Sequence, residues 1–382
     1  SALLSNTTGS ALVAVGTSAL YSNTTADNNT AIGNTALQNN TTGTKNQALG
    51  PSSLISNTTG SFNVAIGLSA LYSNTTASNN TAIGTEALKT NSTGAENTAV
   101  GAYSLDANTT GTPNTAIGYN SLTTNSTGGS NTGLGKSALQ NNTTASHNTA
   151  VGNNCLLANT TGTNNTAVGS LALDANTTGS SNVAVGRSAL SGNTIGASNV
   201  AVGHQCLEAN TEGSNNTAVG IQALDANTTA GNNTAVGASA LGANTTGERN
   251  TAVGTNALAD VTTASNNVGI GFNAGTSHAS GGQSVFIGRD AGGTGGSGIT
   301  AIGFFACSNT TADNTMGIGY NALSANTSGG DNIALGNNAL DANTTGSNNT
   351  ALGRSALGAN TTGENNVAVG LTALQNNTTA DN

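Results

Sequence analysis

The sequence has little of what ordinary soluble domains contain. Its 382 residues include no Trp, 2 Pro, 1 Met and 3 Cys, and 6% of them are charged, compared with about 25% in a typical soluble protein. With 7 Lys and Arg and a formal net charge of −9, the chain lacks the basic clusters that nucleic-acid interfaces require. No apolar run approaches the roughly 18 residues of a membrane-spanning helix. We therefore expect neither a nucleic-acid partner nor membrane insertion of this segment.

Groups that carry chemistry are equally scarce. The cysteines at positions 155, 206 and 307 form no CxxC pair, and the 3 His are far apart in the sequence. No stretch has the ligand spacing of a metal site, and no acidic pair of the kind used by glycoside hydrolases interrupts the sequence. We expect no metal, no cofactor and no enzymatic activity in this segment.

What the chain does contain is a repeat. The segment 232–249, NNTAVGASALGANTTGER, shows the unit that fills the sequence from end to end. The Gly of its T-A-V-G motif recurs every 17 residues from Gly16 to Gly370, with two shorter spacings of 15 and 16 residues after Gly288. A period this strict over the whole chain predicts a repeat architecture.

Each repeat carries the same residue types at the same places relative to this Gly. Val, Ile or Leu directly precedes it, Ala or Gly stands two residues before it, and Asn stands four before it. Leu follows four residues after it and Asn seven after it, usually before Thr-Thr-Gly or Thr-Thr-Ala. The residues that we expect to stack as structural ladders include Asn29, Gly33, Leu37, Asn40, Asn97, Gly101, Leu105, Asn108, Asn233, Gly237, Leu241 and Asn244.

These short β-branched segments and Asn-Thr-Thr-Gly turns predict strands, because no helical periodicity is sustained. A unit of two short strands and two turns forms one coil of a solenoid, with successive coils about 4.8 Å apart. The predicted fold is therefore all-β, a parallel β-solenoid (β-roll) of about 22 coils of 17 residues. Val or Ile and Leu would form two buried aliphatic ladders, and the Asn side chains would pair along the stack. We expect residues 1–382 to form a single continuous solenoid within a longer chain, with irregular coils at 272–318.

The thin apolar core of such a coil predicts a second buried surface. In the strand T-A-V-G, Thr and Val point to one side, whereas Ala and Gly point to the other. We expect the Ala and Gly side to pack closely against another chain, in a homotrimer around one axis. The alternative is a single-chain solenoid in which this side is a tight inner wall.

The segment 29–37, NTAIGNTAL, resembles the head repeat of YadA-like trimeric autotransporter adhesins, and the Asn-Thr-Thr-Gly turns are similar to repeats of phage tail-fibre proteins. The resemblance extends over essentially the whole chain. It implies a left-handed parallel β-roll in a trimer, located outside a cell, at the cell surface or on a virion surface. It also implies attachment to a host-surface or matrix receptor, with carbohydrate as one candidate. The longer 17-residue coil and its turn depart from the adhesin pattern.

Residues 272–300 break the repeat. Gly275 and Gly292 stand where other coils carry Leu. Of the 5 Phe in the chain, four cluster in or beside this segment, and they form a candidate recognition patch: Phe272, Phe286, Phe304 and Phe305. Two interpretations remain open, since the aromatic rings either fill the space left by the missing Leu or form a bend or a binding patch.

The Asn-Thr-Thr segments are also N-x-[ST] sequons, and the candidate glycosylation sites are Asn40, Asn108, Asn176 and Asn244. The alternative is a turn ladder with solvated Thr. The Thr columns raise ice binding as well, although adjacent Thr residues point to different sides of the chain.

Taken together, the sequence predicts a structural and adhesive extracellular fibre, which presents the same side-chain columns many times. End-to-end contacts between chains would extend it into filaments. The alternatives are a densely glycosylated surface filament, an ice-binding solenoid and a carbohydrate-acting tailspike enzyme.

Overall fold

The structure, a computed structural model, describes residues 1–381, and within them the regular elements are all short β-strands. The contacts divide the chain into two units, unit 1 (Ser1–Ile195) and unit 2 (from Gly196 on). The strands of unit 1 are β1 (Val13–Val15), β2 (Thr30–Ile32), β3 (Gln47–Leu49), β4 (Val64–Ile66), β5 (Thr81–Ile83), β6 (Thr98–Val100), β7 (Thr115–Ile117), β8 (Thr132–Leu134), β9 (Thr149–Val151), β10 (Thr166–Val168) and β11 (Val183–Val185). Those of unit 2 are β12 (Val200–Val202), β13 (Thr217–Val219), β14 (Thr234–Val236), β15 (Thr251–Val253), β16 (Val268–Ile270), β17 (Val285–Ile287), β18 (Thr300–Ile302), β19 (Met316–Ile318), β20 (Ile333–Leu335), β21 (Thr350–Leu352) and β22 (Val367–Val369).

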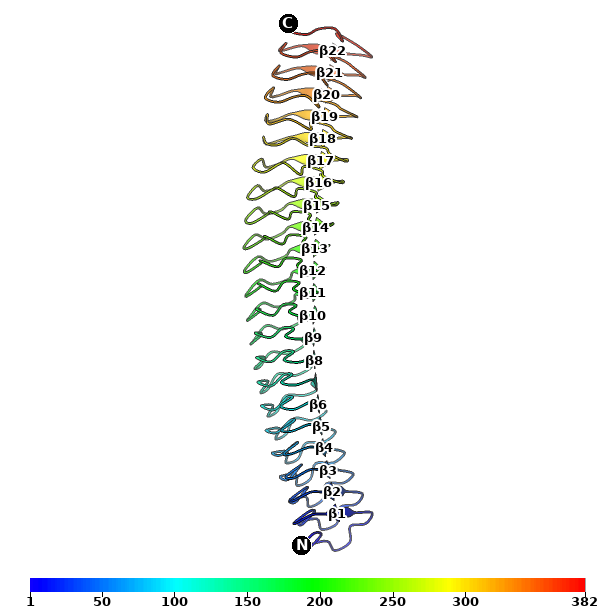
Figure 1. Ribbon diagram of the computed structural model, residues 1–382, viewed down its shortest axis with the longest axis vertical. Helices are drawn as coiled ribbons and strands as arrows, with labels where there is room; N and C mark the ends of the chain where they lie inside the picture. Colours follow the sequence, from blue (N-terminus) through cyan, green and yellow to red (C-terminus); the bar gives the residue numbers. More distant parts are fainter. Residues whose placement is uncertain (382) are drawn as a thin grey trace. The chain divides into compact units, whose positions relative to one another are not determined.

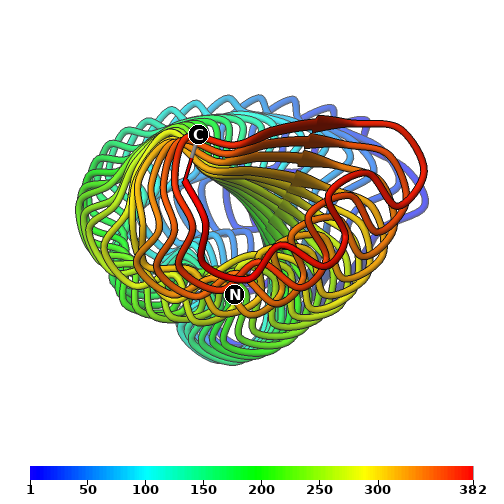
Figure 2. The ribbon, with the colours of Figure 1, turned by 90° about the horizontal axis from the view of Figure 1, so that it is seen from above.

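Within each unit, every strand pairs in parallel with the strand of the next coil. In unit 1 Ala31 lies opposite Ala48, and in unit 2 Ala218 lies opposite Ala235, so that equivalent repeat positions are aligned. Figure 1 shows the strands of each unit one above another, and Figure 2 shows that a single coil is a flattened loop with its strand on one long side. The prediction of a parallel β-solenoid with one coil per repeat is confirmed. Each coil holds one three-residue strand rather than the two that we expected, and turns form the rest. The handedness and the trimer stay predictions.

The prediction for the orientation of the strand is wrong. The middle residue points into the coil, so that Ala235 is fully buried, whereas Val236 directly before the Gly is 37% exposed. Leu241, four residues after the Gly, is fully buried and occupies the interior opposite the strand. Because this Leu fills a narrow loop, only a small side chain fits against it from the strand. Ala therefore forms a tight inner wall rather than an intermolecular contact, and the Val, Ile and Leu column lies on the outer face.

Two columns of buried Asn side chains run along the stack, and in a regular coil one Asn from each column donates to the same backbone carbonyl oxygen. The Nδ2 atom of Asn40 donates to the carbonyl oxygen of Gly43 at 2.9 Å and to Oδ1 of Asn23 in the preceding coil at 3.0 Å. From the other side, Nδ2 of Asn29 donates to the same carbonyl oxygen at 2.8 Å. The Oδ1 atom of Asn29 accepts from the backbone N–H of Asn46 in the next coil at 2.9 Å. Buried amides need such partners on both donor and acceptor atoms, and the repeat supplies them along the stack.

The Gly at the end of each strand is required by backbone geometry. Gly220 has a φ of +136°, which side-chain-bearing L residues rarely adopt, and a Cβ atom there would lie 2.5 Å from the carbonyl oxygen of Gly237 in the next coil. The strand therefore turns sharply where two coils are closest, and only Gly allows this.

Candidate recognition site in the irregular coils

Three successive coils of unit 2, starting at Gly271, Gly288 and Gly303, depart from the repeat. The middle one, residues 288–302, is two residues shorter than a regular coil, and the last, residues 303–318, is one residue shorter. The strands β16, β17, β18 and β19 nevertheless stay in register. The missing residues are therefore taken from the turns, and the surface of these coils differs from that of the regular ones.

Phe286 fills the core of these coils, where Leu is missing. It stands at the strand position that is usually Ala, is fully buried and is the largest buried side chain in the described part of the chain. A Cβ atom at Gly275 or at Gly292 would collide with its ring, so both Gly leave room for the ring in the space that Leu occupies elsewhere. The interpretation that an aromatic ring fills the space of the missing Leu holds for Phe286. Its place in the candidate recognition patch was wrong, because its ring is inaccessible from outside.

His278 takes the place of an Asn in the buried column. It is fully buried, its Nε2 atom lies 2.8 Å from the carbonyl oxygen of Gly281, and its ring packs edge-on against Phe286 with centroids 4.8 Å apart. Its Nδ1 atom is buried without a hydrogen-bond partner. Burial lowers the pKa of this imidazole below its ordinary value, although the contact with Gly281 works in the opposite direction. The side chain is therefore a neutral core group.

The Asn column itself is interrupted here. Val261, His278 and Thr310 stand at its position, and Asn326 resumes it by donating from Nδ2 to Oγ1 of Thr310 at 2.9 Å. The buried Oδ1 atom of Asn244 has no hydrogen-bond partner, because Val261 in the next coil offers no donor. This region therefore has fewer of the contacts that hold regular coils together.

On the outside, an aromatic column with an embedded Arg runs along the irregular coils. It comprises the residues directly after the repeat Gly in four consecutive coils: Phe272, Arg289, Phe304 and Tyr320. The guanidinium carbon of Arg289 lies 5.8 Å from the ring centroid of Phe272 and 5.5 Å from that of Phe304, within cation–π range. Phe304 stacks on Tyr320 at 5.6 Å with ring planes 8° apart. Phe272 and Phe304 belong to the patch predicted from the sequence, whereas Arg289 and Tyr320 do not, although all four share one repeat position.

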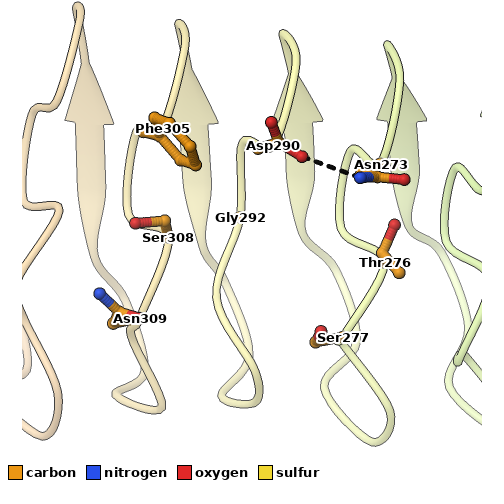
Figure 3. Close-up of a pocket in the computed structure, with 8 residues that line it drawn as sticks. All are labelled: Asn273, Thr276, Ser277, Asp290, Gly292, Phe305, Ser308 and Asn309. Carbon is orange, nitrogen blue, oxygen red and sulfur yellow. Dashed lines mark hydrogen bonds between the residues drawn. The ribbon is translucent and has the colours of Figure 1, made fainter.

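Beside this column lies a notch, a cavity of about 360 Å³ across the three irregular coils. Its walls come from the first and third coils, and its floor is the backbone at Gly292 in the short middle coil (Figure 3). Phe305 and Asp290 lie toward one end of the notch, and Ser277 and Asn309 lie toward the other. The notch lies where the middle coil, residues 288–302, is two residues shorter than a regular coil.

The polar groups of the notch are fixed by hydrogen bonds. Oδ1 of Asp290 accepts from Nδ2 of Asn273 at 2.9 Å, and its Oδ2 accepts from Nε of Arg289 at 3.0 Å. The Asp290 side chain is 19% exposed. At the other end, Nδ2 of Asn309 donates to the carbonyl oxygen of Ser324 at 2.8 Å. The sequence did not predict Asp290, Asn273 and Asn309 as site residues, because only the stacking of the coils brings them together.

No protein-family model and no curated protein matches this chain. The notch is therefore interpreted from its own geometry and chemistry.

Residues 1–381 offer little other candidate chemistry. This range has no group of three or more His, Cys, Asp or Glu arranged to hold a metal ion, and no helix suited to crossing a membrane. Burial raises the pKa of each of the three thiols, Cys155, Cys206 and Cys307, to about 12. Such thiols remain protonated at neutral pH and are poor nucleophiles, and the three buried side chains act as small core fillers.

The structure places the candidate glycosylation sites inside the coil. The side chains of Asn40, Asn108, Asn176 and Asn244 are fully buried. In each of them Nδ2 donates to an Asn Oδ1 atom of the preceding coil and to a carbonyl oxygen of its own turn. Both amide hydrogens are used and no space remains for a sugar, so the folded coil does not accommodate an N-linked glycan at these residues. The Asn and Leu of the expected ladders are likewise buried, and their columns run through the regular coils of each unit.

Proposed function

We propose that this chain is a structural, fibre-like protein of the cell exterior or a virion surface, which associates with copies of itself and serves in attachment. The observation that carries the proposal is the outer side of the strands. We call this side the aliphatic face; it consists of the first and third residues of each strand. In every strand of both units the third residue is Val, Ile or Leu, and the first is Thr, Val, Ile, Met or Gln. None of these residues is charged.

Such a face is unusual for a protein in water. In most regular coils the third strand residue is exposed, with 40% for Ile32, 37% for Val168 and 37% for Val253. Contiguous apolar surface of this kind marks interaction sites in soluble proteins. Burying it supplies the second apolar surface that a coil with a thin core needs.

A second copy of the same chain is the partner that fits this face best. The apolar side chains recur at the spacing of paired strands, about 4.8 Å, and a partner must match that spacing over many coils. Another copy has the same period by construction, and neither side brings an unpaired charge into the contact. Three copies around one axis would cover the face of every chain, with Val and Ile rather than Ala at the interface.

Measuring the mass of the full chain in solution tests this proposal. We expect native mass spectrometry and sedimentation velocity to give about three times the 36.8 kDa of one chain. The triple variant Val202→Lys, Val219→Lys and Val236→Lys places charges on the aliphatic face of three consecutive coils. We expect it to weaken the trimer while leaving the far-ultraviolet circular dichroism unchanged, because these side chains point outward.

A matched control places the same charge elsewhere on unit 2. Thr229→Lys, Thr246→Lys and Thr263→Lys change exposed turn residues and should leave the trimer intact. A monomeric wild-type chain at micromolar concentration, or equal dissociation of both triple variants, would show the proposal to be wrong.

The turns support a fibre more than an ice-binding surface. In the Thr pair of a regular coil, Oγ1 of the first residue, Thr41, donates to the carbonyl oxygen of Thr58 at 3.0 Å. The hydroxyl group therefore links two coils, and only the second Thr of each pair stands free toward solvent. We propose no enzymatic role for this segment.

A further inference from the structure

We propose that the notch of the irregular coils binds a pyranose ring of a neutral saccharide. This inference names a ligand class for the attachment role proposed above and rests on that role. The notch is the place in the described chain where an exposed aromatic ring, a fixed carboxylate and free polar groups surround a cavity. Its volume of about 360 Å³ falls in the range of small-ligand sites, roughly 300 to 1,000 Å³.

The aromatic wall offers an apolar surface of the right kind. Phe305 is 39% exposed, and its ring is held from behind by Phe304, with centroids 4.3 Å apart in an edge-on arrangement. Phe304 in turn stacks on Tyr320. A supported ring with one accessible side presents a flat apolar surface to which the C–H face of a sugar ring can pack.

The carboxylate is oriented for hydroxyl groups before any ligand arrives. Each oxygen of Asp290 already accepts one hydrogen bond, from Asn273 and from Arg289, and each retains a further lone pair. Hydrogen bonds from hydroxyl groups to a carboxylate are charge-assisted and short. Two neighbouring hydroxyl groups of a sugar would therefore bind to Asp290 while the ring rests on Phe305.

The opposite end of the notch supplies both a donor and an acceptor. Ser277 and Asn309 are exposed, and within residues 1–381 no hydrogen bond uses the Ser277 hydroxyl or Oδ1 of Asn309. In Figure 3, Ser277 and Asn309 lie below the level of Gly292, whereas Phe305 and Asp290 lie above it. A sugar ring placed in the notch would contact Phe305 and Asp290 at one end, and Ser277 and Asn309 at the other.

The charges argue against other ligand classes. Asp290 is the one charged residue that lines the notch, and its ion pair with Arg289 leaves no free positive charge among the lining residues, so a phosphate or an acidic sugar is disfavoured. A divalent cation needs several oxygen ligands, whereas one carboxylate faces the notch and the described chain has no metal-binding cluster. A neutral ligand with several hydroxyl groups therefore fits the side chains that line the notch.

Saturation-transfer-difference NMR on the full chain tests the proposal. The probes are the methyl glycosides of glucose, mannose, galactose and N-acetylglucosamine, each titrated up to about 10 mM, since a single ring in an open site is expected to bind with a Kd near 1 mM. We expect at least one of them to bind, and its Kd to rise about ten-fold or more in Asp290→Asn and in Phe305→Asn.

Both substitutions are chosen to preserve the fold. Phe305 and Asp290 each have a φ of +54°, and Asn273 occupies the same coil position with the same φ, so Asn fits this backbone. Asp331→Asn in unit 2 and Phe62→Asn in unit 1 remove the same groups from exposed residues with positive φ outside the notch, and they should leave binding unchanged.

Binding by none of the four glycosides, or equal binding by wild type, Asp290→Asn and Phe305→Asn, would overturn the proposal. The mass measurement of the preceding section is independent of this outcome. A trimer that binds no glycoside leaves the proposed assembly standing and removes only the saccharide site.

Discussion

At the scale of the residue, the repeat Gly allows a backbone that no other amino acid fits. We expect Gly220→Ala to destabilise the fold by about 3 kcal/mol or more, because the strain of a positive φ, about 1–3 kcal/mol, adds to a backbone clash. A Cβ atom at this residue would lie 2.5 Å from the Gly237 carbonyl oxygen. The measurement is the free energy of unfolding from urea denaturation.

A substitution at Gly370 distinguishes the strain of a positive φ from the clash between coils as the cause of the lost stability. Gly370 has a φ of +126°, but a Cβ atom there would meet no atom within 4 Å. Gly370→Ala should therefore cost only the strain, about 1–3 kcal/mol. An equal loss of stability in both variants would mean that contact between coils does not contribute to the requirement for Gly.

The buried Asn columns allow an equally direct test with two adjacent residues. Asn142 donates from Nδ2 to Oδ1 of Asn125 at 2.8 Å and accepts from Nδ2 of Asn159 at 2.9 Å, whereas Asn141 is exposed. Asn142→Ala leaves buried polar groups in two neighbouring coils without partners, so we expect a loss of about 2–4 kcal/mol. Asn141→Ala should change the free energy of unfolding by less than about 0.5 kcal/mol. Similar values for both variants would contradict a stabilising role for the column.

At the scale of the element, the orientation of the strand is what the sequence could not predict. In T-A-V the side chains alternate, so the pattern fits either Ala or its neighbours inside the coil. The apolar character of Val236 favours burial, but the space inside is set by Leu241, which comes from the following turn and is fully buried. That Leu has a φ of +52°, a left-handed conformation that propensity does not predict for Leu. The parallel pairing and the Asn columns follow directly from the period and could be predicted, whereas the second strand that we expected in each coil is a turn.

Some features of the candidate site could likewise be predicted from the sequence, whereas others depend on how the coils fold and stack. The loss of Leu at Gly275 and Gly292 and the shortened coils are visible in the sequence. Phe286 fills the core, whereas Phe305 faces solvent. This difference could not be predicted, because it depends on which side of the coil each repeat position faces. The approach of Asp290 to Phe305 depends on coil stacking, since 15 residues separate them along the chain.

The irregular coils should respond to pH through His278. Burial lowers the pKa of this imidazole below 6.5, so the unfolded state binds more protons than the folded state between the lowered pKa and 6.5. The stability that depends on neutral His278 is therefore fully present above about pH 6.5 and is lost as the pH falls below that value. Hydrogen exchange of residues 272–300, corrected for intrinsic rates, should show lower protection at pH 5 than at pH 7.5.

The substitution His278→Asn supplies the control for this pH dependence. Asn occupies the equivalent position in the regular coils and does not titrate. Protection of residues 272–300 in this variant should be the same at both pH values. A pH dependence that persists in His278→Asn would assign it to another group.

At the scale of the whole molecule, each coil depends on the coils directly next to it. Hydrogen bonds between coils join residues about one period apart: the N–H of Thr132 donates to the carbonyl oxygen of Asn148, and the N–H of Thr149 donates to that of Asn165, both at 2.8 Å. Deleting residues 149–165 from unit 1 joins Asn148 to Thr166 and restores every column. In a stack with nearest-neighbour contacts, such a deletion leaves the remaining interfaces unchanged. We therefore expect the shortened chain to keep its circular dichroism per residue and nearly the same urea midpoint.

Deleting only residues 149–157 removes fewer residues and should do more damage. It joins Asn148 to Ala158 and eliminates the strand β9 together with the buried Leu156, while the adjacent coils keep theirs. The strands on either side then have no partner at their position, and the apolar column has a gap. If the smaller deletion were tolerated as well as the larger one, stability would not depend on the vertical alignment of like residues. The register of 17 residues would then reflect the history of the sequence rather than the physics of the fold.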